Sequence, residues 1–263
     1  MLLGVSLGVG LFSNAQAQTI SGSPHDLSSA RITGSPTDEV CVFCHTPHGG
    51  DNTAPAPLWN KQLPDPAGFT TYDSLNSATI DGNFLAVGSV SIACLSCHDG
   101  SQAMDMVINA PGSGGLVPGG AELSTTAIGT MPGLATNIGK DISNDHPIGI
   151  EYGGFTRGGN VIDPDFNTAD LQTATIGTNT VWWLDVGSIA GRRDKNDIIL
   201  YTRDNTSNGG LAAEPFVECG SCHDPHQGNG TGAESDPGGP GTAVNFMRVA
   251  NTGSQLCLTC HVK

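Results

Sequence analysis

All eight cysteines of this 263-residue chain lie in four copies of one motif, in which two cysteines separated by two residues are followed at once by a histidine. The thiols are Cys41 and Cys44, Cys94 and Cys97, Cys219 and Cys222, and Cys257 and Cys260, and the histidines are His45, His98, His223 and His261. The pattern is typical of covalent haem attachment, in which the thiols add to the porphyrin vinyl groups and the histidine becomes the proximal iron ligand. A zinc site or a disulfide framework would leave the fixed histidine unexplained. The sequence therefore predicts four haem c groups.

The histidine count extends this prediction to the opposite face of each haem. Of the eight histidines, the four outside the motifs are His25, His48, His146 and His226. Four irons need four distal ligands, so we expect bis-histidine coordination throughout. The rival axial ligands are Met104, Met106, Met131 and Met247. Irons with two protein ligands have no open position for a substrate, which favours an electron carrier over an enzyme.

Spacing restricts which haem two of these histidines can reach. His48 follows His45, and His226 follows His223, by only three positions. The two axial ligands stand on opposite faces of a haem, and such a short spacer can hardly pass around the porphyrin edge. Each should therefore bind a haem other than the adjacent one, so that each doubled motif holds two haems together. The pairing of distal ligands with haems stays open, as does a ligand from a neighbouring subunit.

Composition indicates a core made of cofactor more than of side chains. Only 13% of the residues are charged and 5% are aromatic, whereas glycine contributes 37 residues. Such a chain buries little apolar surface against the entropy cost of folding. The predicted fold class is mostly irregular coil around the haems, with short helices at the haem motifs and a small β-hairpin. The hairpin is expected from the strand-like runs 181–190 and 197–202, and the run 84–93 also reads as a strand.

The order of ligands repeats along the chain. A lone histidine, a doubled motif and a single motif occur as His25, Cys41–His48 and Cys94–His98, and again as His146, Cys219–His226 and Cys257–His261. The repeat favours one tetrahaem unit over residues 18–263, made of two dihaem halves, 18–100 and 140–263, with a Gly-rich connection. Coincidence between common motifs is the alternative, because the spacings differ.

Residues 1–17 have the features of a secretory signal peptide. The apolar run Leu2–Phe12 precedes a cleavage pattern at Ala15-Gln-Ala17. No basic residue precedes Arg31, so we expect the true start codon upstream. Export to the cell surface or the extracellular space, or alternatively to the periplasm, agrees with haem attachment outside the cytoplasm. No segment of the mature chain is long and apolar enough to be transmembrane.

The formal net charge of −15 excludes the basic surfaces that bind nucleic acid. It is compatible with a soluble protein that meets cationic partners, other redox proteins or metal oxides as electron acceptors.

The doubled motifs, together with His25 and Asp145-His146-Pro147, resemble those of the bacterial multihaem c-type cytochromes of the doubled C-x-x-C-H type. Their order is similar to that of the extracellular tetrahaem cytochromes of the OmcE-like kind, which polymerise into conductive filaments. The resemblance covers the ligands, whereas the intervening loops carry no motif that tests it. It implies bis-histidine ligation, stacked haem pairs alternating with T-shaped contacts, and one distal histidine from the next protomer. A head-to-tail homopolymer serving extracellular respiration is the function it implies.

Two other hypotheses share most of these residues. A soluble periplasmic electron shuttle, or a subunit of a redox complex, would have the same haems without a polymer. A multihaem reductase would have one iron without a distal ligand, and His25 is the candidate to be missing because it lies nearest a chain terminus.

Overall fold

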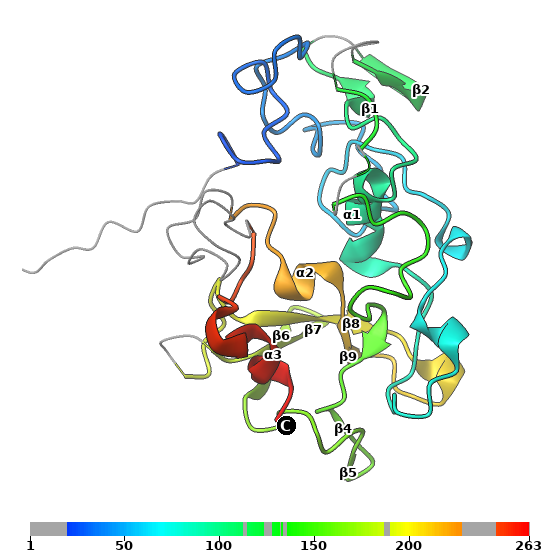
Figure 1. Ribbon diagram of the computed structural model, residues 1–263, viewed down its shortest axis with the longest axis vertical. Coiled ribbons are helices and arrows are strands. Elements are labelled where there is room, and N and C mark those ends of the chain that lie inside the picture. Colours follow the sequence, from blue (N-terminus) through cyan, green and yellow to red (C-terminus); the bar gives the residue numbers. More distant parts are fainter. Residues whose placement is uncertain are drawn as a thin grey trace, which may run out of the picture.

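A computed structural model describes residues 20–112, 115–123, 128–131, 133, 136–186, 190–227 and 246–262, and Figure 1 shows how they are arranged. The expected signal peptide, residues 1–17, lies outside these ranges. No helix in the described residues is long and apolar enough to cross a membrane.

A five-stranded antiparallel sheet, in the order β3-β9-β8-β7-β6, is the largest element. Its strands are β3 (Ile150–Glu151), β6 (Leu171–Ile176), β7 (Asn179–Leu184), β8 (Ile198–Arg203) and β9 (Glu214–Val217). The turn between β6 and β7 contains Gly177 with a φ of 64°. A two-residue hairpin loop needs this left-handed conformation, which glycine adopts without steric cost.

Two smaller antiparallel sheets flank this one, the pairs β1-β2 and β4-β5. Their strands are β1 (Met106–Ala110), β2 (Gly115–Glu122), β4 (Thr156–Arg157) and β5 (Asn160–Val161). Short 3₁₀ turns occur at Pro66–Gly68, Tyr72–Leu75, Thr206–Asn208 and Thr252–Ser254.

Three short helices carry cysteines of the second, third and fourth C-x-x-C-H motifs. They are α1 (Ser89–His98), α2 (Cys219–Cys222) and α3 (Gln255–Cys260), while the first motif lies in consecutive turns. Figure 1 shows α2 between α1 and the five-stranded sheet. The motif cysteines therefore lie on elements that pack against the sheet or against one another.

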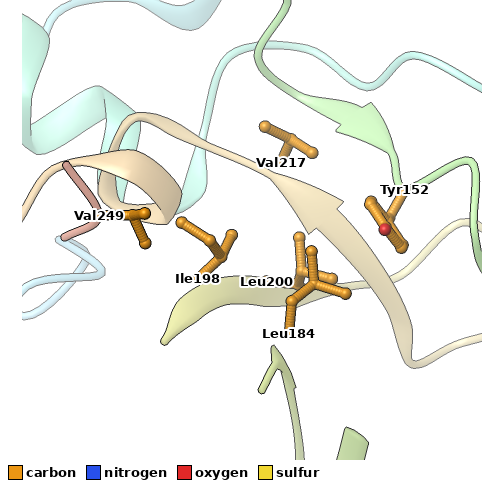
Figure 2. Close-up of a cluster of buried hydrophobic side chains, with 6 residues drawn as sticks. All are labelled: Tyr152, Leu184, Ile198, Leu200, Val217 and Val249. Atoms are coloured by element: carbon orange, nitrogen blue, oxygen red, sulfur yellow. The ribbon is translucent and has the colours of Figure 1, made fainter. Parts of the chain in front are cut away.

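Apolar side chains form two clusters that hold these helices. The first, shown in Figure 2, consists of Tyr152, Leu184, Ile198, Leu200, Val217 and Val249. Leu256 and Cys260 of α3 pack against it. The second consists of Val87, Ile92, Leu95 and Ile142, two of which lie in α1. The sheet therefore supports the fourth motif, and α1 has a core of its own.

The expected fold class, mostly coil with short helices and a small hairpin, is wrong. The runs 181–190 and 197–202 do contain paired strands, β7 and β8, with Trp182 opposite Leu200, but these are inner strands of a larger sheet. Strand β6 gave no apolar alternation because most of its side chains are exposed. Strand β9 contains Pro215, a residue that usually argues against a strand, although its carbonyl accepts a hydrogen bond from the Tyr152 N–H at 2.9 Å.

The strand expected over 84–93 is also wrong, because its second half forms the start of α1. Ile92 and Leu95, three positions apart, both face the second apolar cluster. Leu95 lies after the run 84–93, so the helical spacing becomes visible only when residues beyond that run are included. The local preference of Val and Ile for strands therefore does not determine the secondary structure of this segment.

Candidate haem sites

The four motifs lie beside one another in chain order, and every cysteine is a free thiol. Cys44 of the first motif is close enough to Cys97 of the second for an electrostatic interaction. Cys94 of the second motif and Cys219 of the third are close enough for each to shift the pKa of the other, upward for Cys94 and downward for Cys219. Cys222 interacts in turn with Cys257 of the fourth. Thiols far apart in the sequence are therefore assembled into one continuous series.

Burial keeps several of these thiols protonated. It raises the pKa of Cys44 and of Cys260 to about 12, and that of Cys222 to about 11. A thiol with so high a pKa is a poor nucleophile and behaves as an apolar group. These sulfurs therefore face the protein interior, where an apolar macrocycle could join them.

The second and third motifs are joined by a buried hydrogen-bond network around Glu218. Ser91 in α1 donates to Glu218 Oε2 at 2.5 Å, and the Cys219 N–H donates to Ser91 Oγ at 2.9 Å. Arg203 of β8 donates to Glu218 Oε1 at 2.9 Å. Gly220 lets the Tyr201 side chain approach α2 so closely that a Cβ at this position would collide with its ring. Together these contacts fix α2 between α1 and the sheet.

Two pairs of histidine rings lie close to each other. His45 and His226 have ring centres 6.0 Å apart with planes inclined by 16°. His25 and His98 have ring centres 6.1 Å apart and planes inclined by 71°. A metal–imidazole bond of about 2.0 Å, with about 1.1 Å from nitrogen to ring centre, puts two rings on opposite sides of one metal ~6.2 Å apart. Both centre-to-centre distances therefore match the separation expected for two imidazoles that ligate one iron.

Backbone and carboxylate oxygens orient several of these rings through Nδ1. His45 Nδ1 lies 2.6 Å from the Pro57 carbonyl oxygen, and His98 Nδ1 lies 2.7 Å from that of Thr136. His226 Nδ1 lies 3.4 Å from Asp224 Oδ1. An imidazole that donates from Nδ1 presents Nε2 as its acceptor, which is the usual arrangement of a metal-ligating histidine.

His25 belongs to the N-terminal segment but lies among the ligands of both halves. Its ring stacks on Phe246 at 4.2 Å and hydrogen-bonds the Pro225 backbone. Burial, aided by the neighbouring His98, lowers the pKa of His25 to about 4. The imidazole is therefore neutral at physiological pH, the form that binds a metal.

His146 and His261 form a looser third pair. Burial and then the nearby His146 lower the pKa of His261, so the two rings lie within electrostatic reach. His261 also contacts the Phe166 ring at 4.4 Å between centres. The lone histidine of the second half is thus close to the fourth motif.

His48 and His223 remain outside these pairs. Among the ring contacts of the described residues, none involves either one. His223 nevertheless lies within electrostatic reach of His25 and His98. The His48 side chain is exposed, while its backbone carbonyl accepts hydrogen bonds from Thr46 and Asn109 at 2.8 and 2.6 Å. The described residues contain no group of three or more His, Cys, Asp or Glu side chains arranged to hold a metal ion.

Sequence reasoning missed two residues at these sites. Glu218 directly precedes the third motif, which is the only sequence feature that could have indicated a role for it. Lys61 belongs to no motif or pattern. Arg203 of β8 forms an ion pair with Glu218 at 2.9 Å, a contact that no local sequence pattern indicates.

Comparisons with known proteins do not identify a family or a function for this chain. No family model matches the chain, and no curated protein is similar to it.

Proposed function

We propose that this protein is an exported tetrahaem c-type cytochrome that transfers electrons through four covalently attached haems. The observation that carries the proposal is the ~6 Å separation of the His45–His226 and His25–His98 ring pairs, each beside a motif with two free thiols. Haem iron supplies a one-electron redox centre when bound. The protein's contribution is to attach, ligate and align four such groups.

The ring geometry favours a particular pairing of ligands. His226 serves the haem attached at Cys41–His45, and His25 serves the haem at Cys94–His98. His146 serves the haem at Cys257–His261. In this pairing His226 binds a haem other than that of its own motif, as the short spacing from His223 requires.

His223 also lies within electrostatic reach of His25. Once His25 is assigned to the haem at Cys94–His98, the haem at Cys219–His223 has no distal ligand from its own chain, and His48 has no haem. Met247 is the nearest rival, but it forms an isolated β-bridge with His223. Residues opposite each other in antiparallel pairing have Cα atoms about 4.5–5.5 Å apart, too close to stand on opposite faces of one haem. We therefore assign His48 of one copy to the haem at Cys219–His223 of the next.

Such a shared haem makes a heterologous contact, because one surface contributes His48 and a different surface contributes His223. Contacts of this kind repeat head to tail and generate open filaments when the rotation does not close. The proposal thus includes a homopolymer that conducts electrons to extracellular acceptors such as metal oxides. With two histidines at each iron in the filament, no iron offers an open position for catalysis.

The test compares the filament with its dissociated subunit. The holoprotein is purified with its haems, its haem content is measured by the pyridine haemochrome assay, and electron paramagnetic resonance reports the spin state. We expect only low-spin haem in the filament and one high-spin haem per chain in the subunit. His48→Ala should give the high-spin haem and block assembly. A subunit with four low-spin haems would refute the intersubunit ligand while leaving the tetrahaem carrier intact.

A further inference from the structure

Lys61 is a buried lysine whose ammonium group lies inside the protein. The residue is 1% exposed. Its Nζ donates to the carbonyl oxygens of Met104 and Met106, both at 2.8 Å, and to that of Ala103 at 3.4 Å. A lysine is almost never fully buried without partners, because removing its charge from water is costly. Three converging carbonyl oxygens offset that cost and hold the charge in one position.

The chain around Lys61 is fixed to the first haem motif. The N–H of the preceding residue, Asn60, donates to the Cys44 carbonyl at 2.8 Å. The Asn60 side chain donates to the carbonyls of Val42 and Asn109 at 2.7 and 2.9 Å. The lysine therefore extends from a segment that is bound directly to the cysteines of this motif.

The ammonium group reaches the second motif as well. The carbonyl oxygens that hold it belong to Ala103, Met104 and Met106, which follow Cys97 by six to nine residues. Its charge also lies within electrostatic reach of the Cys97 and Cys44 sulfurs. The positive charge is therefore close to both the first and the second motif.

A fixed charge at this place changes the energy of haem reduction. When one electron from an external reductant enters a ferric haem, the iron becomes ferrous and the haem loses one positive charge. A nearby cation favours the state with less positive charge, and inside a protein it is screened far less than on the surface. A buried lysine beside two haems should therefore raise the reduction potentials of both.

We infer that Lys61 is an electrostatic tuning residue that raises the reduction potentials of the haems attached at Cys41–His45 and Cys94–His98. Electrons within one chain are thereby biased toward this pair of haems and away from the pair attached at Cys219–His223 and Cys257–His261. The inference rests on the proposed attachment of haem at all four motifs.

The test is a spectroelectrochemical titration of the holoprotein with Lys61 replaced by Gln, by Met and by Arg. Gln and Met remove the charge, whereas Arg keeps it. Lys140→Gln is the matched control, because Lys140 is exposed and its replacement removes the same charge at the surface. We expect Lys61→Gln and Lys61→Met to make reduction of two haems about tenfold less favourable, a shift of ~59 mV for one electron. Lys61→Arg and Lys140→Gln should leave the four midpoints unchanged.

High salt separates a buried charge from a surface charge. At about 1 M salt the screening length falls to roughly 3 Å, so a surface effect should disappear while that of Lys61 persists. Equal shifts in all four haems, or shifts no larger than in Lys140→Gln, would overturn the inference. Loss of haem from both neutral variants would also overturn it, because Lys61 would then be a structural residue. The haem count of the unmodified protein tests the proposed function separately.

Discussion

The rings of His45 and His226 lie nearly parallel with their centres 6.0 Å apart, although they belong to different halves of the sequence. The Nδ1 atom of each ring lies near an oxygen, that of the Pro57 carbonyl for His45 and that of the Asp224 carboxylate for His226. This leaves Nε2 of each ring as the nitrogen that could ligate iron. In the proposed pairing, the second doubled motif supplies the distal ligand for the haem of the first.

Replacing His226 with Ala tests this relationship. The haem at Cys41–His45 should lose its distal ligand and become high-spin and open to carbon monoxide, because no other described ring faces His45 in the same way. Absorption and paramagnetic resonance spectra measure the change, and added imidazole should restore the low-spin state. His226→Ala should therefore leave three of the four haems in the low-spin state.

A second background identifies which haem is affected. With Cys41 and Cys44 both replaced by Ala, the first haem is absent, and His226→Ala should then produce no additional high-spin signal. A high-spin signal that persists in this background would place His226 on another haem and contradict the pairing.

Phe246 should determine how firmly His25 is held. Its ring stacks on the imidazole at 4.2 Å, and such ring contacts contribute about 0.5–1.5 kcal/mol. Phe246→Ala should therefore make exchange of His25 for cyanide roughly 2- to 10-fold more favourable at one haem, as measured by absorption titration. Phe246→Leu keeps an apolar side chain but has no aromatic ring. Its cyanide affinity should lie between that of wild type and that of Phe246→Ala. Equal cyanide affinity in all three proteins would show that the stack does not hold the ligand.

Removal of the Glu218 side chain should destabilise the protein strongly. Its carboxylate accepts hydrogen bonds from Ser91 and Arg203 in a fully buried position. Loss of one partner from a buried ion pair costs about 3–5 kcal/mol, because the other charge is left uncompensated. Denaturant unfolding of Glu218→Ala, followed by circular dichroism, measures the loss.

Glu122→Ala is the control for this experiment, since Glu122 is exposed on β2 and should change the unfolding free energy by less than about 0.5 kcal/mol. Similar midpoints for the two variants would mean that the network does not anchor α2.

The buried pair Glu151 and Glu214 should make stability depend on pH. Burial, followed by the neighbouring Glu214, raises the pKa of Glu151 above its ordinary value of 4.5, although Asn83 and Arg157 oppose the shift. The folded protein therefore holds a proton that the unfolded chain releases. The resulting stabilisation is complete below the unfolded pKa and is lost as the pH rises through the raised folded pKa.

Glu151→Gln keeps the neutral form at every pH. Its melting temperature relative to wild type should therefore rise as the pH is raised above 4.5, the ordinary pKa of a glutamate. A constant difference between wild type and Glu151→Gln would contradict a raised pKa.

The sequence lists the candidate ligands directly, whereas the fold class that it predicted is wrong. The motifs and the histidine count are local patterns, whereas β6 is mostly exposed and β9 contains Pro215, so neither strand gives an apolar alternation. Val and Ile in the run 84–93 favoured a strand, but packing of Ile92 and Leu95 against Ile142 selects a helix. Tertiary contacts decided these elements, and the sequence alone does not show them.

The neighbours of each histidine ring could not be predicted from the sequence. The three-residue spacing predicts that His226 serves a haem other than the adjacent one, but no local pattern identifies His45 as the ring beside it. The burial of Lys61 could not be predicted from the sequence for a similar reason. It depends on the carbonyl oxygens of Ala103, Met104 and Met106, which lie more than 40 residues further along the chain.

The most direct test of the central claim is the number and spin state of haems in the native assembled protein. Mass spectrometry and the pyridine haemochrome assay count the covalent haems, and paramagnetic resonance reports their ligation. The account predicts four haem c groups per chain, all low-spin with two histidine ligands. Fewer than four covalent haems, or a ligand-exchangeable high-spin haem in the assembled protein, would contradict it.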